Sequence, residues 1–145
     1  QRAHRPDPRR AVSEPAGLLD TSVFIARESG RPLGKLPERV AVSVVTLGEL
    51  RLGVLHATDP ATRARRGGTL EEARAADPVP VTESTMDAWA RLVADCRQAG
   101  IHRTVKLLDA LIAATAIDLG LPVVTQDGDY VQMAQAHPSL DVLTV

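Results

Sequence analysis

The sequence predicts an α/β domain in which a parallel β-sheet lies between two layers of helices. Short apolar segments that fit strands alternate with longer segments whose apolar residues recur at helical spacing. The strand-like segments are mostly apolar rather than alternating, as expected for strands that are buried on both faces. With 145 residues, of which 44% are apolar, the chain is long enough to form one domain with its own core.

Five short segments are expected to be the strands, because each is brief, mostly apolar and followed by residues suited to a turn or a helix start. They cover residues 17–20, 40–44, 79–81, 123–124 and 141–145. Residues 1–16 contain three prolines and show no apolar periodicity. We expect them to form a loose N-terminal tail, which leaves residues 17–145 as the folded domain.

Helices are expected between these strands, each starting at a side chain that accepts hydrogen bonds from the first free amide groups. The expected helix starts are Thr21 or Ser22, Thr46, Asp59 with Pro60, and Thr82 or Ser84. The helix that contains Trp89 is expected to end at Gly100, and the helix that contains Ile112 at Gly120, because glycine readily takes the left-handed conformation there.

Four acidic residues are prominent because each follows or opens an apolar segment. Asp20 ends the first strand and Asp127 follows the fourth, whereas Glu49 and Asp109 lie in early turns of helices. In parallel sheets of this kind, ligands bind beyond the carboxyl ends of the strands. We therefore expect all four acids to meet at that edge.

A carboxylate in apolar sequence is costly unless it is paired, protonated or bound to a metal. A divalent cation explains four such residues together, and Mg²⁺ and Mn²⁺ both prefer oxygen ligands. Such an ion lowers the pKa of a bound water and offsets charge on a phosphate, which suits hydrolysis of a phosphodiester. Helix capping or solvation is the alternative for any one acid, but it does not predict apolar flanks at all four.

Hydroxyl and acidic side chains next to these acids are candidates for a supporting role. Thr21, Ser22 and Thr125 are expected to orient carboxylates or metal-bound water, with helix capping as the alternative for Thr21 and Ser22. Asp129 lies two residues after Asp127 and is expected either to share the metal or to cap the following helix.

Four segments of the chain resemble the motifs of the PIN domain, in the order in which that family has them. They are residues 19–25 (LDTSVFI), 46–53 (TLGELRLG), 108–116 (LDALIAATA) and 124–130 (VTQDGDY). More narrowly, the chain resembles the VapC-type toxins of bacterial toxin–antitoxin pairs. A single motif of this kind is common, but four in order are specific, and the resemblance runs from about residue 17 to the end.

The resemblance implies a three-layer PIN-like fold and a metal-dependent endoribonuclease that hydrolyses RNA and so inhibits translation or growth. It assigns metal or water binding to Asp20, Glu49, Asp109 and Asp127, with Mg²⁺ as the ion and Mn²⁺ as a substitute. It also implies a homodimer and an inhibitory VapB-type antitoxin whose tail enters the active site, where we expect a basic residue to meet the acids.

A basic segment just before Asp109 contains Arg103 and Lys106. Either residue is expected to contact an RNA phosphate near the metal, with a solvated loop charge as the alternative. None of the four histidines adjoins an acidic motif, so we expect hydrolysis to depend on the metal rather than on a histidine base.

Other function classes fit the sequence less well. A haloacid-dehalogenase-like phosphatase needs Asp-x-Asp after the first strand, but Asp20 is followed by Thr21 and Ser22. A response-regulator receiver needs a lysine on a late strand, and no lysine follows Lys106. Another metal-dependent phosphoryl hydrolase and a catalytically inactive PIN-like binding module remain as alternatives, and a nuclease assay with and without EDTA separates the inactive module from the nuclease.

Composition limits the remaining possibilities. Only 2% of the residues are aromatic, which argues against a stacking platform for single-stranded nucleic acid. The net charge of −1 means that any nucleic-acid contact must come from a local patch. Cys96 is the only cysteine, which excludes an intrachain disulfide. With no membrane-spanning run and no visible signal peptide, we expect a cytoplasmic protein.

Overall fold

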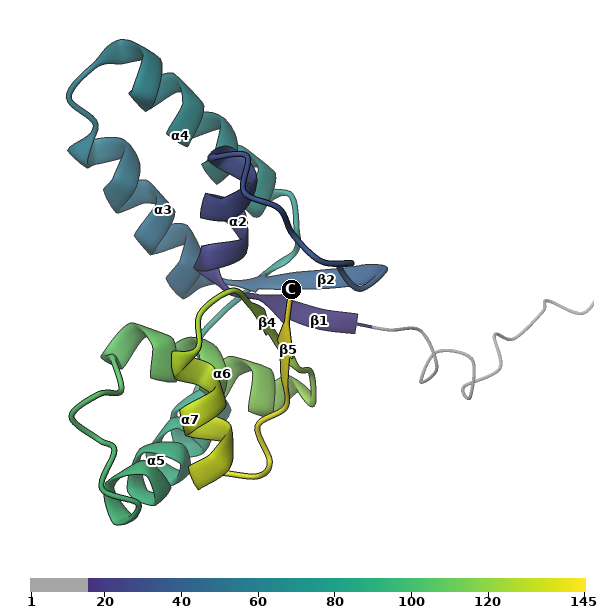
Figure 1. Cartoon of the computed structure of the whole chain (residues 1–145). Coiled ribbons are helices and arrows are strands. Elements are labelled where there is room, and N and C mark those ends of the chain that lie inside the picture. The colour runs from purple at the N-terminus through teal and green to yellow at the C-terminus, as the bar shows by residue number, and fades with distance from the viewer. Residues whose placement is uncertain (1–15) are drawn as a thin grey trace, which may run out of the picture.

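Five parallel strands form one sheet, which confirms the predicted α/β class (Figure 1). The computed structural model describes residues 16–145, in which the strand order is β3-β2-β1-β4-β5. The strands are β1 (Ala16–Leu19), β2 (Arg39–Ser43), β3 (Pro78–Val79), β4 (Val123–Thr125) and β5 (Val142–Thr144). The predicted tail, residues 1–16, lies outside the described residues except for Ala16, which begins β1.

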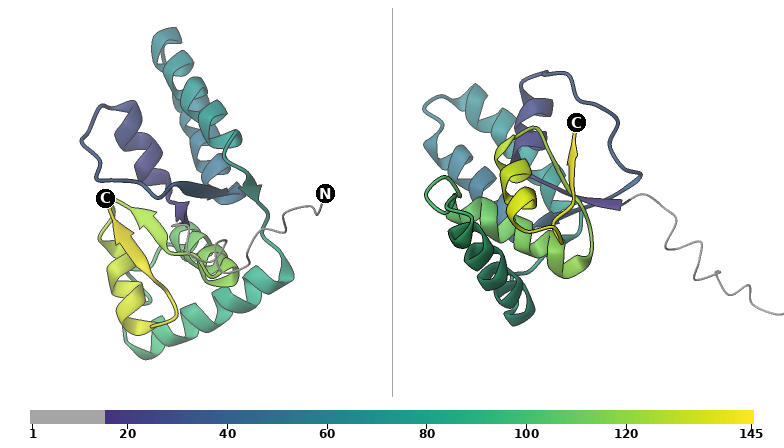
Figure 2. Two further views of the ribbon diagram at one scale, coloured as in Figure 1. Left: turned by 90° about the vertical axis from the view of Figure 1, so that its right-hand side faces the viewer. Right: turned by 60° about the horizontal axis from the view of Figure 1, so that its bottom comes forward.

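Six helices cover the two faces of this sheet in the described part of the chain (Figures 1 and 2). They are α2 (Thr21–Glu28), α3 (Val44–His56), α4 (Pro60–Arg74), α5 (Glu83–Gln98), α6 (Leu107–Leu119) and α7 (Asp129–Ala136). Helices α2, α3 and α4 lie on one face, and α5, α6 and α7 lie on the other. The domain therefore has the three layers that the sequence predicts.

Successive residues of the central strands point into two separate cores. Leu18 and Val123 pack in the cluster formed with α5, α6 and α7, whereas Leu19 and Val124 pack in the cluster formed with α2, α3 and α4. All four side chains are buried. Because both faces are covered, the strands need apolar residues at every position, which explains their continuous apolar character.

Two of the predicted helix starts are wrong. Helix α3 begins after Ser43, whose side chain accepts a hydrogen bond from the Val45 amide, and Thr46 lies inside the helix. Helix α2 is capped by Asp20 rather than by Thr21 or Ser22. Aspartate, serine and threonine are all good capping residues, with threonine somewhat weaker, so capping preference alone does not choose between candidates in one segment.

The predicted starts of α4 and α5 and the predicted ends of α5 and α6 agree with the structure, whereas the predicted strand 40–44 is one residue too long because Val44 begins α3. Asp59 caps α4 and Thr82 caps α5 through their side chains. Gly100 follows the last turn of α5 at φ 76°, and Gly120 ends α6 at φ 66°. Both glycines take the left-handed conformation that other residues adopt at a cost.

Gly17 allows β1 to lie close to its neighbours in the sheet. A Cβ atom at this position would lie 2.5 Å from Val124 Cγ2 and 3.2 Å from Pro37 Cγ. Neither neighbour is the free end of a long side chain, so a methyl group there would displace the packing around β1. The position of β1 matters because Asp20 follows it directly.

The α3–α4 pair extends from the sheet and is joined by arginine side chains. Arg66 Nη1 donates a hydrogen bond of 2.7 Å to Gly53 O, and Arg63 Nη2 donates one of 3.1 Å to Ala57 O. These carbonyl groups lie in or just beyond the last turn of α3, where helical partners are lacking. In residues 16–145, no helix is both long and apolar enough to cross a membrane.

Candidate active site

Acidic residues from separate segments approach one another at the carboxyl edge of the sheet. Asp20 directly follows β1 and Asp127 lies just after β4, its neighbour in the sheet. Glu49 lies in α3, which begins at the end of β2, and Asp109 lies in the first turn of α6. The sequence predicted this meeting from the positions of the strand ends.

Asp20 is the most deeply buried acid of the group, with 3% of its surface exposed. Its Oδ2 accepts hydrogen bonds from Thr125 Oγ1 at 2.9 Å and from the Ser22 amide at 3.3 Å. Its Oδ1 accepts a hydrogen bond from the Tyr130 hydroxyl at 2.9 Å. Three donors offset the cost of burying a carboxylate here and fix its orientation.

Three further carboxylates form the tightest acidic group in residues 16–145. Asp109, Asp127 and Asp129 each place an oxygen so that all three lie within 4.8 Å of one another. Asp127 Oδ1 also accepts the Asp129 amide at 3.0 Å, which holds the turn before α7. Asp129 does not cap α7, because Gly128 is the cap residue and makes no side-chain hydrogen bond.

Glu49 is held next to this group by hydroxyl side chains. Thr21 Oγ1 donates a hydrogen bond of 2.8 Å to Glu49 Oε1. Thr46, which is fully buried inside α3, lies 3.0 Å from the same Thr21 oxygen and supplies the proton, since the Thr21 proton is already used. The first turns of α2 and α3 are thereby linked beside Asp20.

Thr125 and Ser22 connect the carboxylates at the ends of β1 and β4. Besides donating to Asp20, Thr125 Oγ1 accepts the Asp127 amide at 2.8 Å. Ser22 Oγ lies 3.2 Å from Thr125 Oγ1 and accepts the Gln126 amide at 2.9 Å. Neither Thr21 nor Ser22 caps a helix through its side chain; both take part in the network around the acids, as does Thr125.

Burial and the closeness of the other acids raise the pKa of Asp109 to about 6. Burial is the largest cause, followed by the negative charges of Asp20, Asp127 and Glu49, while Lys106 acts in the opposite direction. Like charges at short range disfavour one another's ionised forms, and a cation would reverse the effect. Glu49 is therefore close enough to act on Asp109.

Tyr130 belongs to the site, although nothing in the neighbouring sequence assigns it a role. Its ring is fully buried in the core, and its hydroxyl reaches both Asp20 Oδ1 at 2.9 Å and Asp109 Oδ1 at 3.5 Å. Burial and the charges of these two acids raise the pKa of Tyr130, which keeps the phenol protonated as a donor. The sequence feature that could have identified Tyr130 as a site residue is its position three residues after Asp127, at the start of a helix.

The model of one family, described as "PIN domain", matches residues 17–136. This chain belongs to the PIN domain family. It is 68% identical over 100 residues to Ribonuclease VapC8 of Mycobacterium tuberculosis, an alignment that covers 69% of this chain and 89% of that protein. It is 46% identical over 132 residues to Ribonuclease VapC5 of the same species, covering 90% and 96%. This PIN domain is therefore of the VapC type.

A solved structure supports the same assignment. The crystal structure of VapBC-5 from Mycobacterium tuberculosis, a member of the VapBC family of toxin–antitoxin systems, resembles this PIN domain with a TM-score of 0.78. The two chains share 41% sequence identity, and the match covers 90% of this chain and 98% of that one. The predicted three-layer PIN-like fold is thus confirmed.

The donor set of this PIN domain fits a hard divalent cation. The grouped ligand atoms are all carboxylate oxygens, which Mg²⁺ and Mn²⁺ prefer over nitrogen or sulfur. The ion pairs described for residues 16–145 lie elsewhere, at Arg74–Glu71, Arg91–Asp87 and His137–Asp95. None of these described pairs provides a positive charge for the grouped carboxylates, so a bound cation could balance their negative charge.

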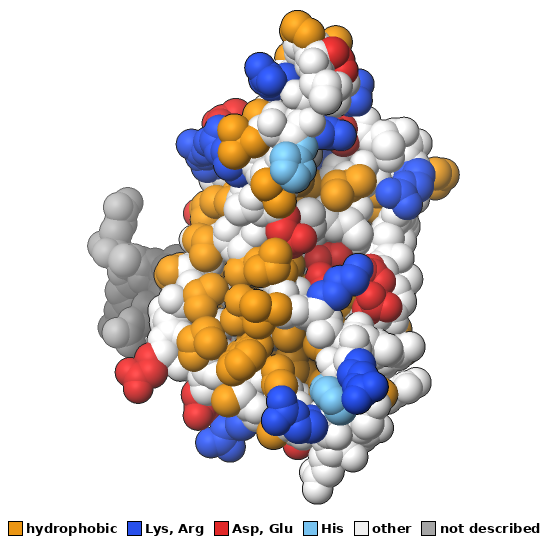
Figure 3. Space-filling view, turned by 90° about the vertical axis from the view of Figure 1, so that its left-hand side faces the viewer, with side chains coloured by type: hydrophobic (Ala, Val, Ile, Leu, Met, Phe, Trp, Pro, Cys, Tyr) orange, Lys and Arg blue, Asp and Glu red, His pale blue; other side chains and the backbone are white. Residues whose placement is uncertain are grey.

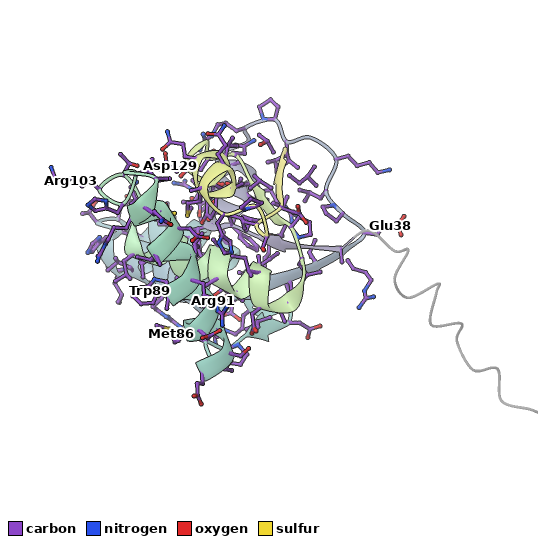
Figure 4. The ribbon with its side chains drawn as sticks, turned by 90° about the horizontal axis from the view of Figure 1, so that it is seen from below. Glu38, Met86, Trp89, Arg91, Arg103 and Asp129 are labelled. Carbon is purple, nitrogen blue, oxygen red and sulfur yellow. The ribbon has the colours of Figure 1, made fainter. Side chains whose placement is uncertain are left out.

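Basic and apolar surfaces border the acids. Figure 3 shows acidic side chains gathered beside a broad apolar area, with a basic side chain over them. Lys106 is exposed immediately before α6, and its charge acts on Asp109. Arg103 is exposed in the preceding loop, and Figure 4 shows it at the end of the molecule where Asp129 lies.

A shallow cavity of about 150 Å³ lies between α5 and the start of α6. Its lining includes Trp89, Val93, Val105 and Leu107. Leu107 is 61% exposed, so the rim of this cavity presents apolar surface to solvent.

Proposed function

We propose that this protein is the toxin of a toxin–antitoxin pair and a Mg²⁺-dependent endoribonuclease. The proposal depends chiefly on one observation: acids from four separate segments meet at the carboxyl edge of the sheet without a basic side chain paired to them in the described ion pairs. The relatives named Ribonuclease VapC8 and VapC5 support RNA as the substrate.

We assign metal binding to Asp20, Glu49, Asp109 and Asp127, directly or through water. The spacing of Asp109, Asp127 and Asp129 supports adding Asp129 to this set. When bound, Mg²⁺, or Mn²⁺ in its place, would lower the pKa of a water molecule and offset the charge of the cleaved phosphate. The carboxylates would hold the ion and orient the water that it activates.

The hydroxyl network serves to keep the carboxylates in place. Thr125 orients Asp20 and the start of the Asp127 turn, and Thr21 orients Glu49. Such outer contacts hold ligands in the geometry that the ion needs. We propose the same purpose for Ser22, which fixes the backbone between Thr125 and Asp127 through the Gln126 amide.

RNA would approach over the loop that precedes α6. Lys106 and Arg103 are exposed there, and we propose that they contact substrate phosphates. Lys106 would contact a phosphate close to the cleaved bond, because its charge lowers the pKa of Asp109. Arg103 would contact a phosphate farther along the RNA. Because cellular RNA is the substrate, we propose that the protein acts in the cytoplasm.

Two protein partners are part of this proposal. The solved VapBC-5 structure supports a VapB-type antitoxin, and we expect the antitoxin to present a basic residue to the acids in place of the metal. We assign the apolar area around Trp89 and Leu107 to a homodimer contact. Co-purification with the product of the adjacent gene tests the antitoxin, and light scattering at micromolar concentration tests the dimer.

The deciding experiment is cleavage of total cellular RNA by the purified protein, with the cut sites mapped. We expect cleavage with Mg²⁺, none in excess EDTA, and none by the D109N variant, which keeps the side-chain shape but removes a charge. A folded wild-type protein that leaves all RNA intact with Mg²⁺ would favour an inactive binding module instead.

A further inference from the structure

One buried hydroxyl lies between two of the acids. The Tyr130 oxygen is 2.9 Å from Asp20 Oδ1 and 3.5 Å from Asp109 Oδ1, and it lies on the second residue of α7. At 3.5 Å the contact with Asp109 is at the limit of a hydrogen bond, so the proton is donated to Asp20. The phenol oxygen thus lies within reach of both carboxylates.

The rest of the Tyr130 side chain is immobilised. It is 0% exposed and packs in the same core cluster as Leu18, Ile112 and Met133, which come from β1, α6 and α7. These elements also carry or adjoin Asp20, Asp109 and Asp129. A hydroxyl on a ring held in this way has a fixed position relative to the acids, as positioning groups at a functional site require.

The three donors on Asp20 are not equivalent. Its Oδ2 has both the Thr125 hydroxyl and the Ser22 amide, whereas Oδ1 has Tyr130 as its only donor described in the structure. Loss of the phenol would leave Oδ1 without that donor. The ring alone would still fill the core, so packing and positioning can be separated by removing a single oxygen atom.

We propose that Tyr130 is a positioning residue whose hydroxyl holds Asp20 Oδ1 beside Asp109 Oδ1 in the arrangement that binds the divalent ion. This inference rests on the proposed function, because it concerns the same metal. Beyond the carboxylate ligands, it assigns an effect on metal affinity to the neutral, buried side chain of Tyr130. Donors that orient metal ligands commonly change affinity or activity by about 10- to 100-fold when removed.

The first test compares Mn²⁺ binding by wild-type protein and by the Tyr130→Phe variant, using isothermal titration without RNA. We expect the variant to bind Mn²⁺ about tenfold more weakly, and to lose kcat on an RNA substrate with KM nearly unchanged. Met133→Leu is the matched control, since Met133 is equally buried on the same helix and has no side-chain hydrogen bond described. It should keep wild-type affinity even where its melting temperature falls.

A second measurement needs no substitution. Tyr130 is the only tyrosine in the chain, so protein labelled with ¹³C at the tyrosine ζ-carbon gives a single resonance. We expect Mg²⁺ to shift this resonance along a saturable curve that agrees with calorimetry. Equal Mn²⁺ affinity of wild-type protein and the Phe variant would overturn the role of Tyr130 but not the metal site. A tyrosine resonance that does not shift when Mg²⁺ is added would do the same. Failure of wild-type protein to bind either ion would overturn the proposed metal site as well.

Discussion

Thr125 Oγ1 donates a hydrogen bond of 2.9 Å to Asp20 Oδ2, joining residues 105 positions apart in the chain. The same oxygen accepts the Asp127 amide at 2.8 Å. One hydroxyl therefore connects the acid after β1 with the turn after β4. Because Thr125 is fully buried, water cannot replace either contact without a change in packing.

The Thr125→Val substitution should weaken both stability and catalysis. It keeps the shape but leaves the Asp127 amide without its acceptor and Asp20 with one donor fewer, which costs about 1–3 kcal/mol. We expect RNA cleavage to fall by about 10- to 100-fold. Urea unfolding and initial cleavage rates measure the two effects.

Thr115→Val is the control for this substitution. Thr115 is also buried, but the hydrogen bond described for its hydroxyl, to Leu111 O, stays within α6. We expect near wild-type cleavage from this variant. If the two variants lose cleavage equally, the special role of Thr125 is wrong.

The raised pKa of Asp109 predicts how the metal-free stability depends on pH. The pKa is about 6 in the folded protein, against 3.8 for an ordinary aspartate. The folded state therefore binds more protons than the unfolded state between these values, so stability falls as pH rises through about 4 to 6. Solvent screening of this partly exposed group limits the loss to roughly 1–2 kcal/mol.

Unfolding of metal-stripped protein at pH 4.5 and 7.5 measures this loss. The D109N variant lacks the titrating group, so we expect a smaller fall in stability between the two pH values and greater metal-free stability at pH 7.5. Saturating Mg²⁺ should reduce the difference between wild-type protein and the variant at pH 7.5. An identical pH profile for both proteins would show that Asp109 titrates normally.

Metal-dependent hydrolysis predicts the chemistry of the RNA ends. Attack by water should leave a 5′-phosphate and a 3′-hydroxyl, because the 2′-hydroxyl of RNA takes no part. End-labelling with and without phosphatase treatment distinguishes these products from others. A 2′,3′-cyclic phosphate, or full activity in excess EDTA, would contradict the proposed reaction.

Gly17→Ala tests the close packing of β1. The added methyl group would meet Val124 Cγ2 at 2.5 Å, and overpacking of this kind typically costs about 1–3 kcal/mol. Gly68→Ala is the control, because Gly68 lies in α4 and, apart from its own helix backbone, no described atom lies within 4 Å of the added carbon. That change should stabilise the protein by about 0.5–1 kcal/mol. Equal melting temperatures for the two variants would contradict this account of β1.

The fold and the main acids could be predicted because their signals lie in short stretches of sequence. Continuous apolar strands indicate a covered parallel sheet, and the end of such a strand places Asp20 and Asp127 at one edge. Glu49 and Asp109 follow from their places in helices that begin near that edge. Each of these inferences needs only local pattern and the general rules of parallel sheets.

The finer contacts could not be predicted because they depend on distances between remote segments. The sequence places Tyr130 only at the end of a motif, because no feature of the neighbouring residues shows that its hydroxyl reaches Asp20 in another segment of the chain. Thr46 was expected to cap a helix, yet Ser43 does so and Thr46 bonds to Thr21 instead. For Asp129 the sequence leaves two alternatives, sharing the metal or capping a helix, and only the turn before α7 shows that Gly128 is the cap residue while Asp129 lies among the acids.

The strand order also constrains when the site can form. β1 is made first among the described strands but lies between β2 and β4, and β4 begins at Val123. In a chain emerging from the ribosome, the edge of β1 that pairs with β4 therefore stays unpaired until most of the domain has been synthesised. Asp20 lacks its donors Thr125 and Tyr130 until β4 and α7 have been synthesised. The acids therefore come together only in the last stage of folding, and incomplete chains carry no assembled site.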